Sequence, residues 1–226
     1  MKLRWTVALL AATTMSGAVA QDTTSEKGKL RYAVGYQIGR DMSERKLDID
    51  LTTVIRAVQD GYAKRDPSVP PEQMGAALEA MQKKMVEQAK AEFDKVSAEN
   101  KRKSDAFLAQ NRTKAGVQTL SSGIQYRVIE NGTGAKPSAN STISMHFRGS
   151  LSTGQEFAST YQGNEPVTIA VSEAPLPGLR QVLPMMSQGS RWEVYFPPDQ
   201  AYGDNPRSPI GPSQAVVFDV KLVEVK

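Results

Sequence analysis

The sequence predicts an α+β protein, with a helical amino-terminal half and then an antiparallel sheet wrapped around one short helix. Three patterns indicate this fold. Apolar residues recur every three or four positions between 29 and 64, a second helical pattern runs from Glu72 without a proline before Pro137, and apolar and polar residues alternate after Gly123. The first spacing gathers side chains on one face of a helix, and alternation gathers them on one face of a strand.

Two helices are expected before residue 65. Their apolar positions are Leu30, Ala33, Val34, Ile38 and Met42 in the first, and Val54, Ile55, Val58 and Tyr62 in the second. Asp50 supplies a polar cap for the second helix. Gly35 and Gly39 lie one turn apart, so they either weaken the first helix or let another helix backbone approach closely.

A long helix is expected after the proline-rich break at 66–71. Helical from about 72 to 113, it would be roughly 60 Å long at 1.5 Å per residue. Its apolar stripe disappears between Ser97 and Asp105. A helical stretch that is polar on all sides predicts a segment that bridges two domains through solvent. Lys101–Lys103 would lie on a solvated face. Trypsin should cleave this segment readily, because nothing is expected to pack over it.

Half-buried strands are expected in the carboxy-terminal half. Ile143, Met145 and Phe147 alternate with polar residues, and similar alternation follows at 192–196 and 216–222. A proline near the start and another just past the end delimit one short helix at about 178–183.

Composition excludes several classes of function. The chain has 28 basic and 24 acidic residues, a formal charge of +4, which is too small to predict binding of nucleic acid. It has no cysteine and one histidine, His146, so a thiol nucleophile and a His-pair metal site are excluded, and a Ser-His-Asp triad is improbable. His146 is expected on the solvent side of its strand. No metal or cofactor is expected.

The first twenty residues are typical of an export signal. Lys2 and Arg4 precede a short apolar run, and Ala18-Val19-Ala20 forms a small-x-small cleavage site. The run is far shorter than the ~20 residues of a membrane-spanning helix. We therefore expect cleavage near Ala20, a periplasmic or secreted protein, and no membrane span.

A series of short motifs follows in fixed order along the second half. They are His146–Gly149, Gly154–Phe157, Pro177–Leu179, Gly189–Val194, Ala201–Gly203, Pro209–Pro212 and Val216–Leu222. Their order and spacing resemble the FKBP-type peptidyl-prolyl isomerase domain. The resemblance implies an antiparallel sheet around one short helix, and binding of proline-containing polypeptides.

The first half resembles the amino-terminal domain found ahead of certain bacterial FKBP domains, as in the macrophage infectivity potentiator (Mip) group. The similarity lies in Leu30–Gly39, Ala106–Asn111 and Gly116–Tyr126. It implies a homodimer whose short helices intertwine, with a long helix carrying each catalytic domain outward. The expected boundaries are a signal peptide at 1–20, a helical dimerisation domain at 21–71, a connecting helix at 72–114 and the isomerase domain at 115–226.

The resemblance also implies a site. Tyr202, the backbone N–H of Leu176 and Phe157 would take the catalytic roles. The substrate-binding positions would be Phe147, Ala158, Val167, Pro175, Leu179, Ile210 and Phe218, and a macrolide is a candidate ligand of the same pocket. For Phe157 and Phe218 taken singly, ordinary core packing is the stronger interpretation, whereas Tyr202 lies in a Pro- and Gly-rich loop, where binding residues gather.

Several positions depart from the family pattern. Leu179 stands where the family usually has Trp, Ala158 where it has Asp, Phe147 where it has Tyr, and Val167 where Phe is common. The expected pocket is wider and more aliphatic, with reduced activity. Two hypotheses therefore stand beside each other, an isomerase assisting the folding of exported proteins and a periplasmic chaperone or peptide-binding dimer with a degenerate pocket. A purely structural homodimer is the third.

Overall fold

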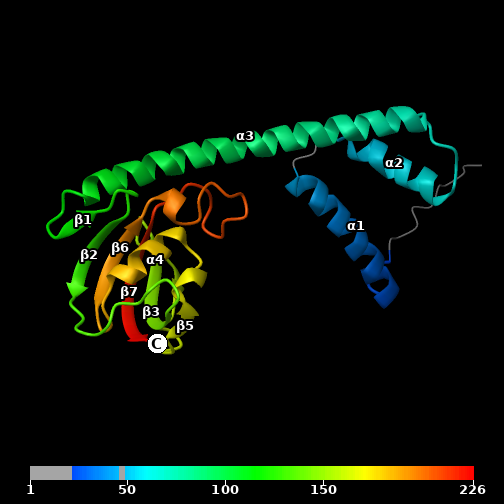
Figure 1. Cartoon of the computed structure of the whole chain (residues 1–226). Coiled ribbons are helices and arrows are strands. Elements are labelled where there is room, and N and C mark those ends of the chain that lie inside the picture. The colour runs from blue at the N-terminus through cyan, green and yellow to red at the C-terminus, as the bar shows by residue number, and fades with distance from the viewer. Residues whose placement is uncertain (1–21, 46–48) are drawn as a thin grey trace, which may run out of the picture. The chain divides into compact units, whose positions relative to one another are not determined.

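A computed structural model describes residues 22–45 and 49–226 (Figure 1). The expected export signal lies outside the described residues. Contacts divide the chain into two compact units, one ending at Met74 and the other running from Gly75 to Lys226. None of the described helices has both the length and the apolar character needed to cross a membrane.

The first unit contains the two short helices that the spacing predicted. Helix α1 spans Glu26–Glu44 and helix α2 spans Leu51–Tyr62. The Ser25 side chain accepts a hydrogen bond from the Gly28 N–H, and Asp50 accepts one from the Thr53 N–H, so each helix begins at a polar cap. Gly28 is the one buried residue among those described in this unit, and most of the unit's apolar side chains remain exposed.

Helix α3 spans Pro71–Asn111, close to the range expected from the absence of prolines. It begins with Pro71, whose missing N–H would have no intrahelical partner at that position. Lys101 pairs with Asp105 and Lys103 with Glu99 across one helical turn, and both lysines are exposed. The solvated face expected at Lys101–Lys103 is therefore present.

The prediction that nothing packs over residues 97–105 is wrong, because the opposite face of this part of α3 is packed against a loop. Ser104 is 1 % exposed and is hydrogen-bonded to the backbone of the loop before the last strand. Ser97 and Asn100 also bond to this loop. The missing apolar stripe does not reveal this contact, because this part of α3 docks through side-chain hydroxyl and amide groups. We therefore expect trypsin to cleave slowly at Lys101–Lys103, contrary to the prediction from the sequence.

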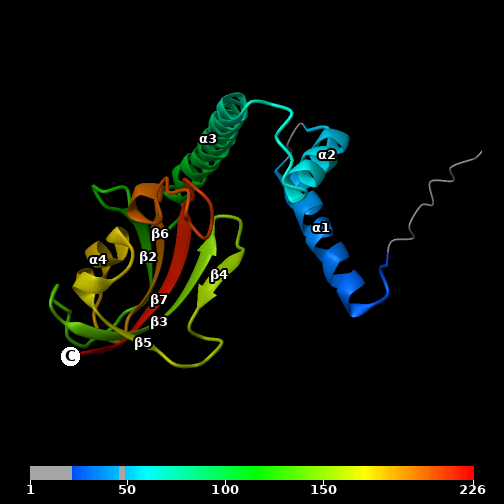
Figure 2. The ribbon, with the colours of Figure 1, turned by 90° about the vertical axis from the view of Figure 1, so that its right-hand side faces the viewer.

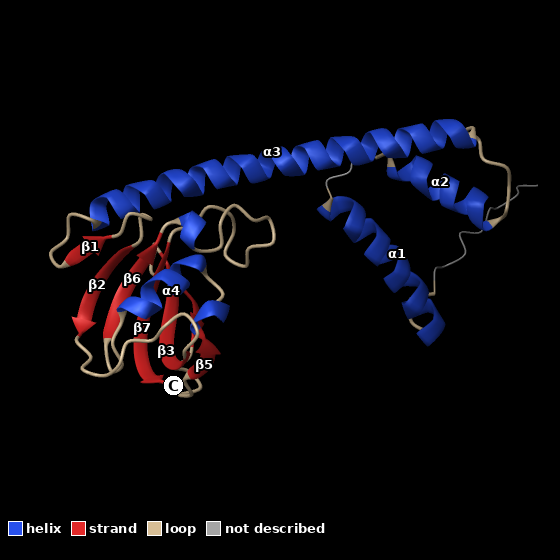
Figure 3. Ribbon diagram, in the orientation of Figure 1, coloured by secondary structure: helices blue, strands red, loops and turns tan. Residues whose placement is uncertain are grey.

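The second unit is built on one antiparallel sheet of seven strands. The sheet order is β1-β2-β6-β7-β3-β4, and β5 pairs with β3 (Figures 2 and 3). The strands are β1 (Val117–Thr119), β2 (Gln125–Glu130), β3 (Thr142–Leu151), β4 (Glu156–Ser159), β5 (Val167–Ala170), β6 (Arg191–Phe196) and β7 (Val216–Val225).

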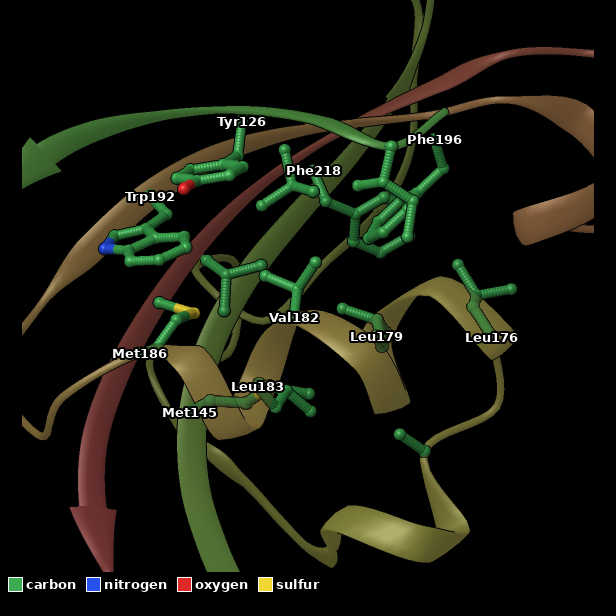
Figure 4. Packing of buried hydrophobic residues seen from close by; sticks show 14 of the residues in the cluster. Tyr126, Met145, Leu176, Leu179, Val182, Leu183, Met186, Trp192, Phe196 and Phe218 are labelled. Carbon is green, nitrogen blue, oxygen red and sulfur yellow. The ribbon is translucent and has the colours of Figure 1, made fainter. Parts of the chain in front are cut away.

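The short helix α4, Pro177–Val182, lies on one side of this sheet (Figure 2). Figure 4 shows Leu176 and Leu179 facing Phe196 and Phe218 across the core, with the stacked pair of Tyr126 and Trp192 at its other end. Their side chains are 8 % exposed or less. The core therefore fills the space between α4 and the sheet, and the predicted fold class is confirmed.

Candidate functional site

Phe218, near the start of β7, is the centre of an aromatic cluster. Its ring lies 5.8 Å from that of Phe147, 6.0 Å from that of Phe157 and 5.7 Å from that of Phe196, measured between centroids. Phe218 is 3 % exposed and Phe196 is fully buried, while Phe147 and Phe157 are half-buried. The cluster therefore has a buried base and an upper edge open to solvent.

A β-bulge gives Phe157 its place in the cluster. Ser150 pairs with Glu156 and Gly149 pairs with Ala158, so Phe157 is the extra residue on β4. A bulge of this kind re-aims a side chain. The Phe157 ring reaches over Gly149, where a Cβ atom would lie 3.0 Å from both Phe157 Cζ and Phe218 Cζ. Gly149 thus leaves room for the two rings.

Tyr202 adds a polar group to the open edge of the cluster. Its ring meets that of Phe157 edge to face, with 5.9 Å between centroids. Tyr202 is half-buried, and burial raises the pKa of its phenol above the usual value of 10.0. A buried phenol favours its neutral form, so the hydroxyl remains a hydrogen-bond donor at neutral pH.

Leu176 supplies a second donor. Its carbonyl caps α4 by accepting from the N–H groups of Leu179 and Arg180 at 3.1 and 3.4 Å. Its own N–H donates to no backbone carbonyl among the described residues. The Leu176 and Leu179 side chains are each 2 % exposed and belong to the core. The backbone of Leu176, rather than its side chain, is therefore the group that could bind a ligand.

The remaining predicted positions divide into two groups. Val167 and Ile210 are half-buried and pack against the core that contains Phe218, and Ala158 is half-buried beside Phe157. Pro175 is exposed and lies outside this cluster. The structure therefore joins Phe147, Phe157, Tyr202 and Phe218 in one aromatic cluster, packs Val167 and Ile210 against the same core, and leaves Pro175 outside it.

His146 lies away from this surface. Its ring stacks on Tyr161 with 5.0 Å between centroids, and its Nδ1 lies 3.2 Å from Thr160 Oγ1. It is half-buried rather than freely solvent-facing, because Tyr161 covers it. This environment packs the histidine and leaves it apart from the aromatic cluster.

Sequence reading missed residues that support the site. Gly178 is one, because a Cβ there would lie 2.3 Å from Phe196 Cδ1. The polar face of α3 is another. Ser97, Asn100, Ser104 and Asn111 recur at spacings of three, four and seven, which is a helical period, so a search for polar as well as apolar stripes would have found this face.

The described site offers shape and hydrogen bonding rather than acid–base chemistry. Aromatic rings and aliphatic side chains form its surface, and a neutral phenol and a backbone N–H can donate to carbonyl oxygens. Such a surface suits an apolar ring flanked by peptide carbonyls, which is the chemistry of a proline-containing segment.

Two family descriptions match the chain. Residues 27–128 match the "Domain amino terminal to FKBP-type peptidyl-prolyl isomerase", and residues 133–223 match the "FKBP-type peptidyl-prolyl cis-trans isomerase". Together they span most of the sequence.

Individual proteins of this family are also similar to the chain. The "Outer membrane protein MIP" of Legionella longbeachae is 38% identical over 221 residues, covering 96% of this chain and 94% of that protein. The "Peptidyl-prolyl cis-trans isomerase Mip" of Coxiella burnetii is 32% identical, covering 97% and 95%. The crystal structure of FkpA from Escherichia coli matches with a TM-score of 0.70 at 28% identity, covering 90% of this chain and 98% of that one. The chain belongs to the FKBP-type peptidyl-prolyl cis-trans isomerases, of the Mip and FkpA kind.

Proposed function

We propose that this isomerase acts on Xaa-Pro bonds of exported proteins and binds them on the apolar surface formed by Phe147, Phe157, Tyr202 and Phe218. The observation that carries this proposal is the Tyr202 ring edge-on to Phe157, above the buried Phe218, with its phenol kept neutral. The exported location rests on the signal-like first twenty residues. We expect the intact mass of protein purified from the periplasm to correspond to a chain that begins at Gln21. A mass that still includes Trp5 would contradict this expectation.

An apolar surface is sufficient for this reaction. Rotation about the Xaa-Pro bond faces a barrier of ~18–20 kcal/mol because the amide is planar and charge-separated. Moving the amide out of water removes solvation from its partly negative oxygen, which disfavours the planar form more than the twisted one. The enzyme then lowers the barrier without forming a covalent bond.

The two donors would hold the peptide. In this proposal the Leu176 N–H and the Tyr202 hydroxyl each donate a hydrogen bond to a carbonyl oxygen of the bound segment, while the prolyl ring lies over the aromatic cluster around Phe218. The Leu176 N–H, which has no backbone acceptor among the described residues, and the position of Tyr202 at the open edge support these roles.

The departures from the family pattern support weaker catalysis. Leu179 offers no aromatic surface where the family usually has Trp, and Ala158, half-buried beside Phe157, lacks the carboxylate that the family usually carries there. Each tenfold loss in kcat/KM corresponds to about 1.4 kcal/mol of transition-state stabilisation. A gain in kcat/KM and in macrolide affinity is expected from Ala158→Asp with Leu179→Trp, provided the core accepts the larger ring.

A paired assay tests this function against the chaperone alternative. We expect the mature protein to accelerate isomerisation of a short Xaa-Pro peptide in a protease-coupled assay, and a macrolide to inhibit it. Suppression of aggregation of a proline-free client, with no acceleration of the peptide reaction, would favour the chaperone with a degenerate pocket.

Replacement of Tyr202 by Phe is expected to lower kcat/KM by about tenfold, because it removes one hydrogen bond made in the transition state.

Because burial raises the pKa of Tyr202 above 10.0, the parent should keep its activity from neutral pH up to about pH 9. Activity should fall only when the phenol ionises. A pH profile of kcat/KM measures both, and a Tyr202→Phe variant with full activity would remove Tyr202 from the mechanism.

We also propose that α1 and α2 pair with a second copy of the chain. Leu30, Ile38 and Val58 are 66%, 49% and 62% exposed, although they lie on the apolar stripes of these helices. Among the described atoms, nothing lies within 4 Å of a Cβ placed on Gly35 or Gly39, so a partner backbone could approach there. Helices of 19 and 12 residues that bury one glycine are marginal alone, and a homodimer would bury their apolar faces.

Val34→Asp combined with Ile38→Asp is expected to convert the dimer into monomers. Both side chains are about half exposed, at 54% and 49%, and they lie one turn apart on α1. Two carboxylates buried without partners would oppose association. Light scattering coupled to size exclusion measures the change, and Arg40→Ala, which removes an exposed ion pair with Glu44, is the control expected to stay dimeric. An unchanged dimer would place the interface elsewhere.

A further inference from the structure

One face of helix α3 is tied to the loop that carries Tyr202 and Ile210. Ser97, Asn100 and Ser104 lie at helical spacing on this face, and all three bond to residues 204–215 of the loop. In Figures 1 and 2 the loop, in orange, runs beside the green carboxy-terminal half of α3. Both belong to the same compact unit.

Ser104 makes the most enclosed of these contacts. Its hydroxyl accepts a hydrogen bond from the Ala215 N–H at 2.7 Å and donates to the Ser213 carbonyl at 3.0 Å. Ser104 is 1 % exposed and Ser213 is 6 % exposed. Ser213 has φ 53°, a left-handed conformation that residues with a side chain rarely adopt. The helix thereby fixes a turn that the sequence of the loop alone does not favour.

Asn100 and Ser97 hold the rest of the loop. The Asn100 side-chain amide donates to the Pro212 carbonyl at 2.9 Å, two residues after Ile210. Ser97 Oγ donates to Asp204 Oδ1 at 2.7 Å, two residues after Tyr202. The Ser213 N–H also donates to the Gly203 carbonyl at 2.9 Å, so the two ends of the loop are joined. The segments that follow Tyr202 and Ile210 are thus both fixed to one rigid helix.

We infer that Ser104 and Asn100 are positioning residues for catalysis, acting through the loop that presents Tyr202 and Ile210 to the substrate. This inference rests on the proposed site. Neither side chain is among the residues assigned to the substrate. Their role is to reduce the number of conformations that the loop samples before binding, because a donor that must first be ordered binds the transition state less tightly.

A second polar anchor on the same helix provides a matched comparison. Asn111 is fully buried, and its side-chain amide donates to Gln125 Oε1 at 2.9 Å, on β2. Gln125 in turn donates to the Leu108 carbonyl at 2.8 Å. Loss of Asn111 therefore weakens the docking of α3 without removing a bond to the Tyr202 loop.

The test compares Ser104→Ala, Asn100→Asp and Asn111→Ala in the mature protein, at a temperature where all remain folded. Asn100→Asp keeps the shape of the side chain, removes the donor to Pro212, and alters a half-exposed residue that the fold can tolerate. Two measurements are made on each variant, kcat/KM on an Xaa-Pro peptide and the rate of trypsin cleavage after Arg207, an exposed residue of the loop. Thermal unfolding measures the loss of stability separately.

We expect Ser104→Ala and Asn100→Asp to lower kcat/KM by about fivefold and to speed cleavage at Arg207 by a similar factor. Asn111→Ala should lower the unfolding temperature while leaving kcat/KM and the rate of cleavage after Arg207 near those of the parent. If Ser104→Ala and Asn100→Asp keep full activity while Tyr202→Phe is impaired, the positioning role is wrong and the proposed site stands. If Tyr202→Phe and Ile210→Ala also keep full activity, the proposed site fails, and this inference with it.

Discussion

Phe218→Ala is expected to destabilise the isomerase unit by about 3–5 kcal/mol and to abolish most of its activity. Phe218 is 3 % exposed, and its ring contacts those of Phe147, Phe157 and Phe196. Its removal leaves a cavity beneath the two half-buried rings of the proposed site. Since a domain is stable by only about 5–15 kcal/mol, a large share of the total would be lost.

Urea unfolding followed by tryptophan fluorescence measures this change. Trp192, stacked on Tyr126 in the core, is the one tryptophan beyond the first twenty residues. Val223→Ala on the same strand is the control, because Val223 is 41% exposed and its truncation should cost less than about 1 kcal/mol. Similar losses in the two variants would show that Phe218 is not central to the core.

Gly178→Ala is expected to cost about 3 kcal/mol, the upper part of the range for overpacked cores. A Cβ on Gly178 would lie 2.3 Å from Phe196 Cδ1 and 2.8 Å from the backbone carbonyl oxygen of Gln200. Phe196 is fully buried and Gln200 contributes main chain, so neither can move aside without disturbing the core. Helix α4 would have to shift away from the sheet.

The same unfolding measurement tests this prediction. Gly163→Ala is the matched control, because nothing lies within 4 Å of a Cβ at that position and its φ is not in the left-handed region. It should be neutral or slightly stabilising, since alanine restricts the unfolded chain. Equal stability of the two variants would mean that α4 packs less closely than the structure indicates.

The sequence predicted the helices and strands well because their signals are local. Proline breaks, Asp50 as a cap and the alternation around Phe147 and Phe218 each depend on neighbouring residues alone, and α2, α3 and the sheet lie where these signals placed them. The convergence of Phe147, Phe157, Tyr202 and Phe218 required the family resemblance, because it joins strands and a loop distant in sequence.

The polar docking of α3 was the clearest error. A helix without an apolar stripe is usually solvated, and Ser97, Asn100 and Ser104 are short polar side chains that carry no sign of burial in sequence. Their partners are the Ser213 and Pro212 carbonyls and the Asp204 side chain, in a loop about a hundred residues later. Backbone carbonyls are present in every residue, so no local pattern marks them. Phe157 depended similarly on a bulge, which composition does not predict.

The location of the substrate is the central claim, and amide chemical-shift mapping with a short Xaa-Pro peptide tests it most directly. We predict that the largest shifts in the isotope-labelled protein occur at Leu176, Ala158, Tyr202 and Ile210, with the Leu176 N–H shifting because it gains an acceptor. A groove elsewhere on the isomerase unit, lined in part by Lys114, Arg127 and Glu193, serves as the internal comparison and should show little change. Shifts concentrated in that groove, with Leu176 and Tyr202 unmoved, would contradict the account.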